Sequence, residues 1–232
     1  MKWKTIWENR KLHSNETLIL DELLYADGFD CGAGKFDSNI WLKYIDSILD
    51  KINIDESATF FEIGCGAGAF LYPLYNKKYL VSGIDFSALL INKAKEVMPD
   101  MIFNIMNANK LDIKIKYDII LSNSVFQYFD DLNYAKEVIG LMIKKSNKRI
   151  IILDINDKDK ELTAHSIRRG AVNKEEYDEK YKELNHLFYE KQWFKEIAIK
   201  NNCSIEIYEQ NIEGYLNGSF RYNVFMEKLD NE

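Results

Sequence analysis

Residues 60–70 of the chain read Phe60-Phe61-Glu62-Ile63-Gly64-Cys65-Gly66-Ala67-Gly68-Ala69-Phe70. An apolar strand here runs directly into three glycines at alternate positions and then into a helix-length segment. Glycine lets the backbone turn tightly and bring its N–H groups against a ligand at the start of the helix. Asp85 follows 21 residues after Gly64, at the end of the next apolar run, where a carboxylate can accept the hydroxyls of a ribose. Together the two features predict a site for a nucleoside-containing cofactor.

On both sides of this loop, short apolar runs alternate with helix-length amphipathic segments. One such helix is marked by Ser87 as its N-cap and by Pro99, which stops the apolar pattern. Alternation of this kind is typical of a parallel sheet with helices on both faces. The sequence therefore predicts an α/β fold with strands at 59–63, 79–84, 101–105, 117–121, 149–153, 204–208 and 222–226.

The same alternation of strand-like and helix-like segments suggests how the chain is divided. We expect an N-terminal cap at 1–37, a cofactor-binding core at 38–155, a helical cap over the acceptor site at 156–190, and a helix with late strands that complete the sheet at 191–232.

Composition excludes several classes of protein. The 232 residues, 47% of them apolar, suffice for one well-packed domain and are too hydrophobic for a disordered chain. With 31 basic against 37 acidic residues, the net charge of −6 argues against nucleic acid as a partner. Cys31, Cys65 and Cys203 are widely separated and predict neither disulfides nor a zinc site. The longest purely aliphatic run, 150–153, is far short of the about 20 residues that span a bilayer. We expect a cytoplasmic protein with no membrane partner.

Two cofactor classes fit the glycine loop. Gly64, Gly66 and Ala69 satisfy the dinucleotide pattern G-x-G-x-x-A, which allows a nicotinamide cofactor. None of the 14 tyrosines has a lysine four residues later, which disfavours the short-chain dehydrogenases. An S-adenosylmethionine site needs an acid two residues before the first glycine, which is Glu62, and a polar-then-Ala turn after the third strand, found at 107–108. The loop alone leaves both cofactors open, and these additional features favour S-adenosylmethionine.

With these motifs the chain resembles the class I S-adenosylmethionine-dependent methyltransferases. The resemblance covers about residues 40–154 and rests on the segments 62–68, 83–87, 107–109 and 117–128. It implies a Rossmann-like, seven-stranded, mostly parallel sheet whose last hairpin includes an antiparallel strand. It also implies S-adenosyl-L-methionine as the cofactor, S-adenosyl-L-homocysteine as its product, and no obligatory metal ion.

The resemblance assigns roles to individual residues. Asp85 would bind the ribose and Phe86 would lie beside the adenine, whose edge Asn107 and the Ala108 amide would read. Asn107 replaces the usual aspartate of this motif and can still accept from the exocyclic amine. Asn123 would approach the methionine moiety. The full set predicted to bind the cofactor is Trp7, Phe29, Glu62, Gly64, Cys65, Gly66, Asp85, Phe86, Asn107, Ala108 and Asn123.

The chemistry of methyl transfer decides which further residues matter. The reaction is an in-line displacement on carbon, so the protein must align the acceptor with the sulfonium and exclude water. An alcohol acceptor needs a general base, whereas a carboxylate or phosphate oxygen is already anionic. His186 lies in an aromatic segment after the fifth strand, and Tyr128 follows the fourth strand. These two residues are the candidates for catalysis, with a structural role as the alternative for each.

Arginine is rare in this chain, with only five copies, so the doublet Arg168-Arg169 and Arg221 stand out. Forked guanidinium donors suit phosphate or carboxylate groups better than lysine does. An anionic acceptor is one interpretation of these arginines, and surface ion pairs with the acid-rich cap are the other. The residues predicted to bind the acceptor are Gln127, Arg168, Arg169, Tyr189 and Arg221.

A second resemblance reaches beyond the cofactor motifs. Residues 26–35, with 70–74, 211–215 and 221–225, resemble a bacterial methyltransferase subgroup linked to capsule and to phosphonate or phosphoramidate metabolism. It implies a small phosphorylated acceptor whose phosphoryl oxygen the arginines clamp, and a methyl ester product such as the methyl phosphoramidate of capsules. The oligomeric state is left open.

Three alternatives stay open at this point: a nicotinamide-dependent oxidoreductase, a cofactor-binding partner subunit without catalysis, and a metal-assisted methyltransferase. The metal-assisted variant would use Asp130 or Asp131 after the fourth strand and Asp154, Asn156 or Asp157 after the fifth, all of which we interpret instead as residues of solvated turns. Methylation of adenine in nucleic acid is disfavoured, because Ser-Asn-Ser-Val at 122–125 stands where that class carries Asn/Asp-Pro-Pro-Tyr/Phe.

Overall fold

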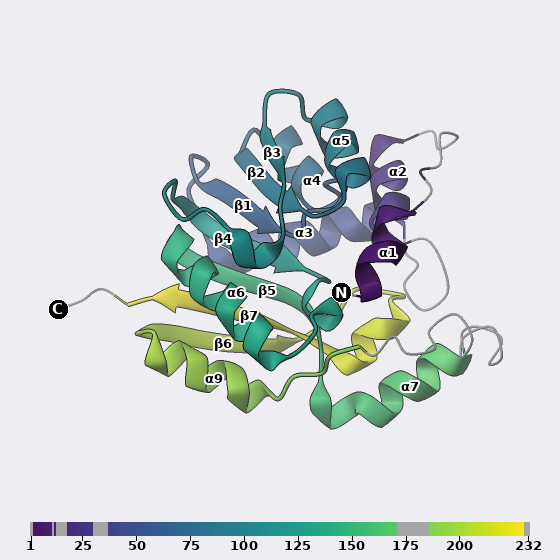
Figure 1. Cartoon of the computed structure of the whole chain (residues 1–232), viewed down its shortest axis with the longest axis vertical. Coiled ribbons are helices and arrows are strands. Elements are labelled where there is room, and N and C mark those ends of the chain that lie inside the picture. Colours follow the sequence, from purple (N-terminus) through teal and green to yellow (C-terminus); the bar gives the residue numbers. More distant parts are fainter. Residues whose placement is uncertain (1, 11, 13–17, 30–36, 171–185, 230–232) are drawn as a thin grey trace.

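A central sheet organises the computed structural model, which describes residues 2–10, 12, 18–29, 37–170 and 186–229. The seven strands follow the order β3-β2-β1-β4-β5-β7-β6 (Figure 1). Only β7 runs against its neighbours, being antiparallel to both β5 and β6. The predicted α/β fold is confirmed, including the antiparallel strand of the last hairpin. The strands are β1 (Thr59–Ile63), β2 (Leu80–Asp85), β3 (Ile102–Ile105), β4 (Tyr117–Asn123), β5 (Ser146–Asn156), β6 (Cys203–Glu209) and β7 (Arg221–Lys228).

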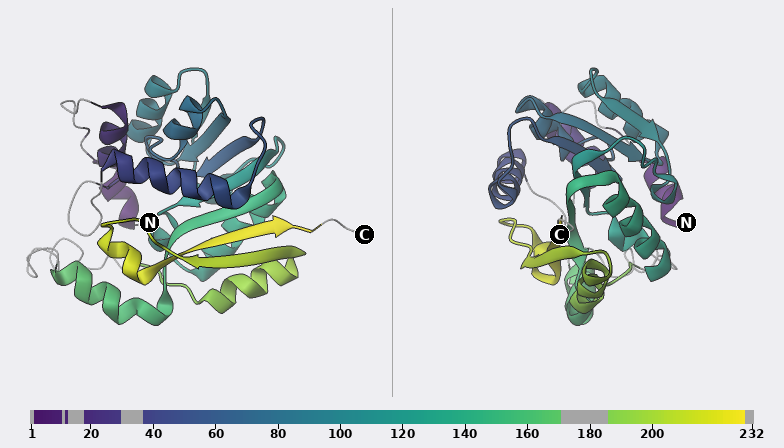
Figure 2. Two further views of the ribbon diagram at one scale, coloured as in Figure 1. Left: turned by 180° about the vertical axis from the view of Figure 1, so that it is seen from behind. Right: turned by 90° about the vertical axis from the view of Figure 1, so that its left-hand side faces the viewer.

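Helices cover both faces of the sheet, with α3 on one face and α6 and α9 on the other (Figure 2). Side chains of α2, α3, α4 and α5 share one apolar core with the sheet. Those of α6 and α9 share a second core on the opposite face. The α-helices are α1 (Lys2–Glu8), α2 (Ile19–Ala26), α3 (Ser38–Ile52), α4 (Leu71–Asn76), α5 (Ala88–Val97), α6 (Leu132–Lys145), α7 (Glu161–Gly170) and α9 (Lys191–Lys200).

The helix α5 shows how local sequence sets these elements. Ser87 is its N-cap, and the Ser87 Oγ accepts a hydrogen bond from the Leu90 amide at 3.4 Å. Leu90 and Ile91 then face the core, and the helix ends at Val97. Pro99 follows two residues later, as the sequence pattern predicts, because its ring cannot continue the helix.

The carboxyl ends of β1, β2, β4 and β5 meet at one edge of the sheet because these strands are parallel. The helices α1, α2 and α7 gather at the end of the molecule toward which β1 and β4 run (Figure 1). The chain leaves β4 through Ser124, which has a positive φ of 56°. The described parts of the two predicted caps thus lie at this edge, while residues 171–185 of the second cap lie outside the described part of the chain.

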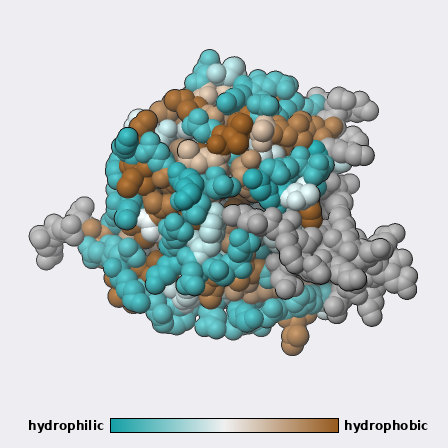
Figure 3. Space-filling view, viewed as in Figure 1, coloured by the Kyte–Doolittle hydropathy of each residue, from teal (hydrophilic) through white to brown (hydrophobic). Residues whose placement is uncertain are grey.

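Hydrophilic side chains cover much of the described surface seen in Figure 3, with apolar ones between them, most visibly over the region of β3 and α5. In the described ranges, no helix combines the length and the apolar character that crossing a bilayer requires.

Candidate active site

A cavity opens at the carboxyl ends of β1, β2 and β4, with about 910 Å³ of empty space including its mouth. Pockets that bind small ligands and cofactors have volumes of this order. Its walls come from the glycine loop after β1, the ends of β2 and β4, the segment after β3, and α1. Every residue predicted to bind the cofactor lines it: Trp7, Phe29, Glu62, Gly64, Cys65, Gly66, Asp85, Phe86, Asn107, Ala108 and Asn123. The contacts of these residues with the cofactor itself stay predictions.

The glycine loop has no room for side chains at Gly64 and Gly66, because residues of two other segments lie in close contact with it. Gly64 and Gly66 have positive φ angles of 72° and 54°. A Cβ on Gly64 would lie 2.5 Å from Val125 Cγ2, and a Cβ on Gly66 would collide with the Asp27 carboxylate. Both the backbone conformation and the close neighbours therefore exclude side chains here.

Asp85, the acid predicted to bind the ribose, is the last residue of β2. Its Oδ1 accepts from the Ser87 amide at 2.8 Å and its Oδ2 accepts from the Gly66 amide at 3.2 Å. The carboxylate thus joins the glycine loop to the start of α5. Burial raises the pKa of Asp85 to about 6, although these amide hydrogen bonds favour the ionised form.

Glu62, the acid two residues before the first glycine, is 2% exposed. Its Oε2 has no hydrogen-bond partner among the residues that the structure describes. Burial raises the pKa of Glu62 well above its ordinary value, and the nearby charges of Asp27 and Asp85 add to the effect. An enclosed carboxylate with an unsatisfied oxygen fits a ligand that carries positive charge and hydrogen-bond donors, as S-adenosylmethionine does with its sulfonium and ammonium groups.

Asp27 also lines the cavity, and sequence analysis did not identify it as a site residue. It lies just after α2, and its two oxygens accept from the amides of Ala67 and Ala69 at 2.6 and 2.9 Å. Burial raises the pKa of Asp27 to about 7. No motif spacing connects Asp27 to the glycine loop, because the hydrogen bonds span 40 and 42 residues.

The segment after β3 supplies the wall predicted to read adenine. The Met106 amide donates to Asp85 O at 2.8 Å, and this bond brings the chain back toward the end of β2. Asn107 and Ala108 follow at once and share the cavity wall with Phe86. Two segments that each resemble a nucleoside-binding motif are thereby placed side by side.

The N-terminal helix α1 covers the cavity with aromatic side chains. Trp3 and Trp7 both line it, and their ring centroids lie 4.8 and 5.4 Å from that of Tyr128. The guanidinium of Arg10 donates to Tyr25 O at 2.6 Å and ties the chain after α1 to the end of α2. The described part of the first cap therefore forms one wall of the cavity.

The two predicted catalytic residues lie near one another. Tyr128 lines the cavity, and the His186 ring centroid lies 5.7 Å from that of Tyr128 and 4.6 Å from that of Trp3. Burial and the charges of Arg168 and Arg221 lower the pKa of His186 well below its ordinary value. The imidazole is therefore neutral at pH 7 and accepts a proton only weakly.

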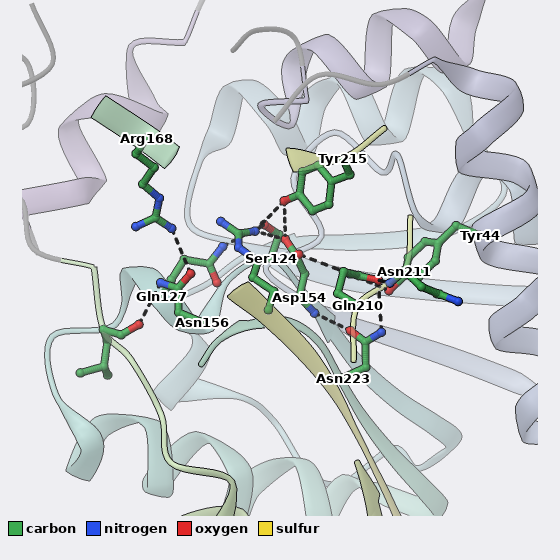
Figure 4. A network of polar contacts seen from close by, with 12 residues as sticks. Tyr44, Ser124, Gln127, Asp154, Asn156, Arg168, Gln210, Asn211, Tyr215 and Asn223 are labelled. Atoms are coloured by element: carbon green, nitrogen blue, oxygen red, sulfur yellow. Dashed lines mark hydrogen bonds and ion pairs between the residues drawn. The ribbon is translucent and has the colours of Figure 1, made fainter. Parts of the chain in front are cut away.

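Arg221 belongs to a buried polar network, of which Ser124, Asp154 and Tyr215 are labelled in Figure 4. Its Nη1 forms an ion pair with Asp154 and also donates to Tyr215 Oη at 2.7 Å and to Ser124 Oγ at 3.3 Å. Ser124 lines the cavity, and its Oγ also accepts from Gln127 Nε2 at 2.8 Å. The charge of Arg221 is therefore balanced by Asp154, and Arg221 holds the turn after β4.

Arg168 and Gln127 lie on the side of Ser124 that is opposite to Asp154 and Tyr215 (Figure 4). Arg168 is 7% exposed, and its Nη2 donates to Asn156 Oδ1 at 2.9 Å. Gln127 is fully buried, and within the described ranges its Oε1 has no hydrogen-bond partner. This polar cluster is built from β5, α7 and the turn after β4, and it borders the end of the cavity where Tyr128 lies.

The remaining predicted residues lie elsewhere. Tyr189 does not line the cavity; it is packed in the core between the sheet and α9, and its hydroxyl donates to Phe126 O at 2.8 Å. The side chain of Arg169 lies outside the described part of the structure. The interpretation of Asp154, Asn156 and Asp157 as residues of solvated turns is wrong, because all three are buried at the end of β5 or directly after it. Asp154 is paired with Arg221, and Asp157 is paired with Lys191 at 3.0 Å.

Comparison with known protein sequences finds methyltransferases. Residues 54–214 match the profile of a family described as Methyltransferase domain. The malonyl-[acyl-carrier protein] O-methyltransferase of Bacillus anthracis is 28% identical over 131 residues, which are 52% of this chain and 48% of that protein. The enzyme of the same name from Priestia megaterium is 34% identical over 84 residues, which are 34% of this chain and 30% of that protein. The matched regions span about half the length of these curated relatives or less.

Solved structures with a similar fold include enzymes crystallised with S-adenosylmethionine. Magnesium protoporphyrin IX methyltransferase from Synechocystis PCC 6803, with that cofactor bound, superposes with a TM-score of 0.61 at 14% identity, over 97% of this chain and 91% of that one. An amino pentose methyltransferase from Micromonospora echinaspora, also with the cofactor bound, gives a TM-score of 0.64 at 11% identity, over 94% of this chain and all of that one. At these identities the likeness concerns the fold alone.

Proposed function

We propose that this chain, which belongs to the Methyltransferase domain family and uses S-adenosylmethionine as its cofactor, transfers the methyl group to an anionic oxygen of a small acceptor. Membership of this family decides against the nicotinamide-dependent oxidoreductase that the glycine loop left open. The acceptor that we favour is a phosphoryl group, with the decoration of a capsular polysaccharide as its setting. Arg168, buried beside the Tyr128 end of the cavity, carries this proposal.

Arg168 is suited to hold an anion. Its guanidinium lies 5.0 Å from the ring centroid of Phe220 and 5.9 Å from that of Phe188, and Asn156 fixes its orientation. A guanidinium in such surroundings presents forked N–H donors that match carboxylate or phosphate oxygens. Arg221 forms an ion pair with Asp154 and holds the turn after β4, which gives it a structural role.

The state of His186 supports the same acceptor class. S-adenosylmethionine supplies an electrophilic methyl group, and an anionic oxygen can attack it without losing a proton. A neutral alcohol would need a base, and the lowered pKa of His186 makes this imidazole a poor one. For an anionic acceptor, the protein has to orient the two reactants and keep water out. Arg168 would orient the acceptor, while Trp3 and Trp7 enclose the cavity.

The names of the curated relatives support an anionic oxygen as well. Malonyl-[acyl-carrier protein] O-methyltransferases act on a malonyl group, which ends in a carboxylate. The choice of a phosphoryl group over a carboxylate rests on the resemblance of residues 26–35 and 221–225 to the capsule-linked subgroup. Both acceptors share the negative charge and the oxygen geometry that a guanidinium recognises.

The test is a panel of small acceptors incubated with S-adenosylmethionine, with S-adenosylhomocysteine and the methylated product measured by mass spectrometry. The panel holds phosphate monoesters, phosphoramidates, phosphonates, carboxylates, and neutral alcohols and amines of matched size. We expect turnover with phosphoryl acceptors and none with neutral ones. Preference for carboxylates would remove the phosphoryl assignment alone, whereas preference for neutral acceptors would overturn the proposal.

The variant Arg168→Gln sharpens the test. Removing one side of a buried charged contact costs about 2 kcal/mol or more, so kcat/KM for the acceptor should fall at least about thirtyfold. The affinity for S-adenosylmethionine should stay unchanged, because Arg168 does not line the cofactor cavity. Arg149→Gln is the matched control, since Arg149 lies at the opposite end of β5 in a half-exposed pair with Glu227. Equal acceptor kinetics in the two variants would contradict the role of Arg168.

A further inference from the structure

The glycine loop offers no backbone donor to a ligand, because each amide from residue 64 to residue 69 already donates to an oxygen of the chain. Gly64 and Cys65 donate to Ile84 O at 2.8 and 3.0 Å. Gly68 donates to Cys65 O at 2.9 Å. These three bonds are internal to the loop and to β2, and they shape the turn.

The other three amides of the loop point to carboxylates. Gly66 donates to Asp85 Oδ2 at 3.2 Å, and Ala67 and Ala69 donate to the two oxygens of Asp27 at 2.6 and 2.9 Å. Two side chains from distant segments thus occupy the donors of the loop. Asp27 takes two of the three and comes from the N-terminal cap, whereas Asp85 comes from the core.

These contacts matter because the loop sequence also fits a dinucleotide. In dinucleotide-binding folds, the amides of such a loop hold the pyrophosphate, and the glycines allow its close approach. Here a carboxylate of the protein lies against those amides, and a Cβ on Gly66 would collide with it. A pyrophosphate cannot share that position with Asp27, because the two anions would compete for the same donors and repel one another.

The charged groups around Asp27 add to this effect. Glu62 from β1 and Asp85 from β2 lie close enough to interact with it electrostatically. Among the residues that the structure describes, two positive groups of the N-terminal segment face this region: Arg10, which is held by backbone carbonyls of α2, and Lys4, which is paired with Glu8 at 3.5 Å. Three carboxylates therefore share one cavity, and a cation in it is electrostatically favoured.

We propose that Asp27 is a cofactor-specificity residue, which closes the glycine loop to pyrophosphate-bearing nucleotides and gives the cavity the negative charge that selects a cationic cofactor. This inference does not depend on the identity of the acceptor. Through Asp27, the N-terminal cap would help to select the cofactor, in addition to forming a wall of its cavity.

Calorimetric titration tests the proposal with two ligands, S-adenosylmethionine and ADP-ribose. Asp27→Asn keeps the size of the side chain and one acceptor oxygen but removes the charge. We expect it to weaken S-adenosylmethionine binding at least about tenfold while ADP-ribose binding does not weaken, so that the ratio of the two affinities falls. Asp37→Asn is the matched control: Asp37 also accepts from two backbone amides, those of Asn39 and Ile40, but as the exposed N-cap of α3. The control should leave both affinities unchanged.

A second measurement uses the wild-type protein alone and does not depend on the folding of a variant. Burial raises the pKa of Asp27 to about 7, so part of the population is protonated at neutral pH. A cation bound nearby favours the ionised form, and binding of S-adenosylmethionine at pH 7 should release protons. The release is read from the dependence of the binding enthalpy on the ionisation enthalpy of the buffer, and it should decrease in Asp27→Asn.

Two results would overturn the proposal. One is an unchanged ratio of S-adenosylmethionine to ADP-ribose affinity in a folded Asp27→Asn protein, as shown by circular dichroism. The other is binding of S-adenosylmethionine to the wild-type protein without proton release, together with affinity for ADP-ribose within about tenfold of that for S-adenosylmethionine.

Discussion

The cofactor cavity and the proposed acceptor side of this molecule differ in the charged side chains that they carry. Asp27, Glu62 and Asp85 line the cofactor cavity, whereas Arg168 and Arg221 lie beyond Ser124 and Tyr128. The acidic cavity is suited to a cationic methyl donor, and the guanidinium of Arg168 on the other side is suited to an anion. If the acceptor is anionic, as we propose, this difference in charge would orient the two reactants with respect to one another.

The two sides also differ in how they are built. The cofactor cavity is formed mainly by turns that directly follow β1, β2, β3 and β4. The proposed acceptor side is assembled from the end of β5, the start of β7 and α7, and its ion pair between Arg221 and Asp154 joins residues 67 positions apart.

The largest effect is expected where the buried charge of the acceptor side is left unbalanced. In Asp154→Ala, Arg221 loses its ion-pair partner while it stays 3% exposed, and the free energy of unfolding should fall by about 3–5 kcal/mol. Glu227→Ala is the control, because its pair with Arg149 is half-exposed and should contribute about 1 kcal/mol or less. Denaturant unfolding measures both, and equal losses would show that the Asp154–Arg221 pair does not support the acceptor side.

A smaller effect is expected at the glycine loop of the cofactor side. Gly66→Ala forces an alanine to φ near 54° and its Cβ against Asp27, at a cost of about 1–3 kcal/mol in cofactor affinity or stability. Gly140 in α6 offers the opposite case, because a Cβ there meets nothing within 4 Å. Gly140→Ala should stabilise the fold by about 0.5–1 kcal/mol and leave cofactor affinity unchanged. Calorimetry and thermal unfolding distinguish the two, and cofactor affinity that is unaffected by Gly66→Ala would contradict the tight contact.

The acidic side should also respond to pH in a defined direction. Burial raises the pKa of Asp27 to about 7 and that of Asp85 to about 6, so the folded apoprotein binds more protons than the unfolded chain between pH 4 and pH 7. Stability contributed in this way is present in acid and is lost as the pH rises through these values. At about 1.4 kcal/mol per pH unit, with about two units for Asp27 and about one for Asp85, the apoprotein should lose about 4 kcal/mol between pH 5 and pH 8 relative to the Asp27→Asn, Asp85→Asn double variant.

Binding of S-adenosylhomocysteine, which retains the ammonium group, should oppose this loss because it favours the ionised carboxylates. Chemical denaturation at several pH values, with and without the ligand, measures the effect. Parallel pH profiles for the wild-type protein and the double variant would contradict the raised pKa values.

The smallest effect compares two helix caps on opposite faces of the sheet. Ser87 caps α5 and Asp131 caps α6, each by accepting a backbone amide, and replacing either by alanine should cost about 1 kcal/mol of stability. Only Ser87→Ala should also weaken cofactor binding, since the Ser87 hydroxyl also donates to Trp7 O at 3.4 Å and Trp7 lines the cavity. If Asp131→Ala weakened cofactor binding equally, the cap of α5 would have no special connection to the cavity.

Much of the fold and of the cofactor side could be predicted because the signals are local. The glycine loop, the acid at the end of β2 and the cap of α5 each lie within a few residues of the element they define. Hydrophobic periodicity and turn chemistry act over such distances, so the strand positions came out within a few residues of their true ends. Every residue predicted for the cofactor lines one cavity for the same reason.

The positions of Asp27 and of the proposed acceptor residues could not be predicted, because they depend on contacts between segments that are far apart in the sequence. Arg221 stood out as a rare arginine, yet its pairing with Asp154 joins residues 67 positions apart. Asp27 reaches the loop amides across 40 residues, and Tyr189, predicted to bind the acceptor, is packed in the core. The positions of the strands and the presence of a nucleoside site could be inferred from the sequence, because short-range patterns specify them. The charges that face that site could be identified only in the folded chain, because electrostatic energy depends on distances that folding defines.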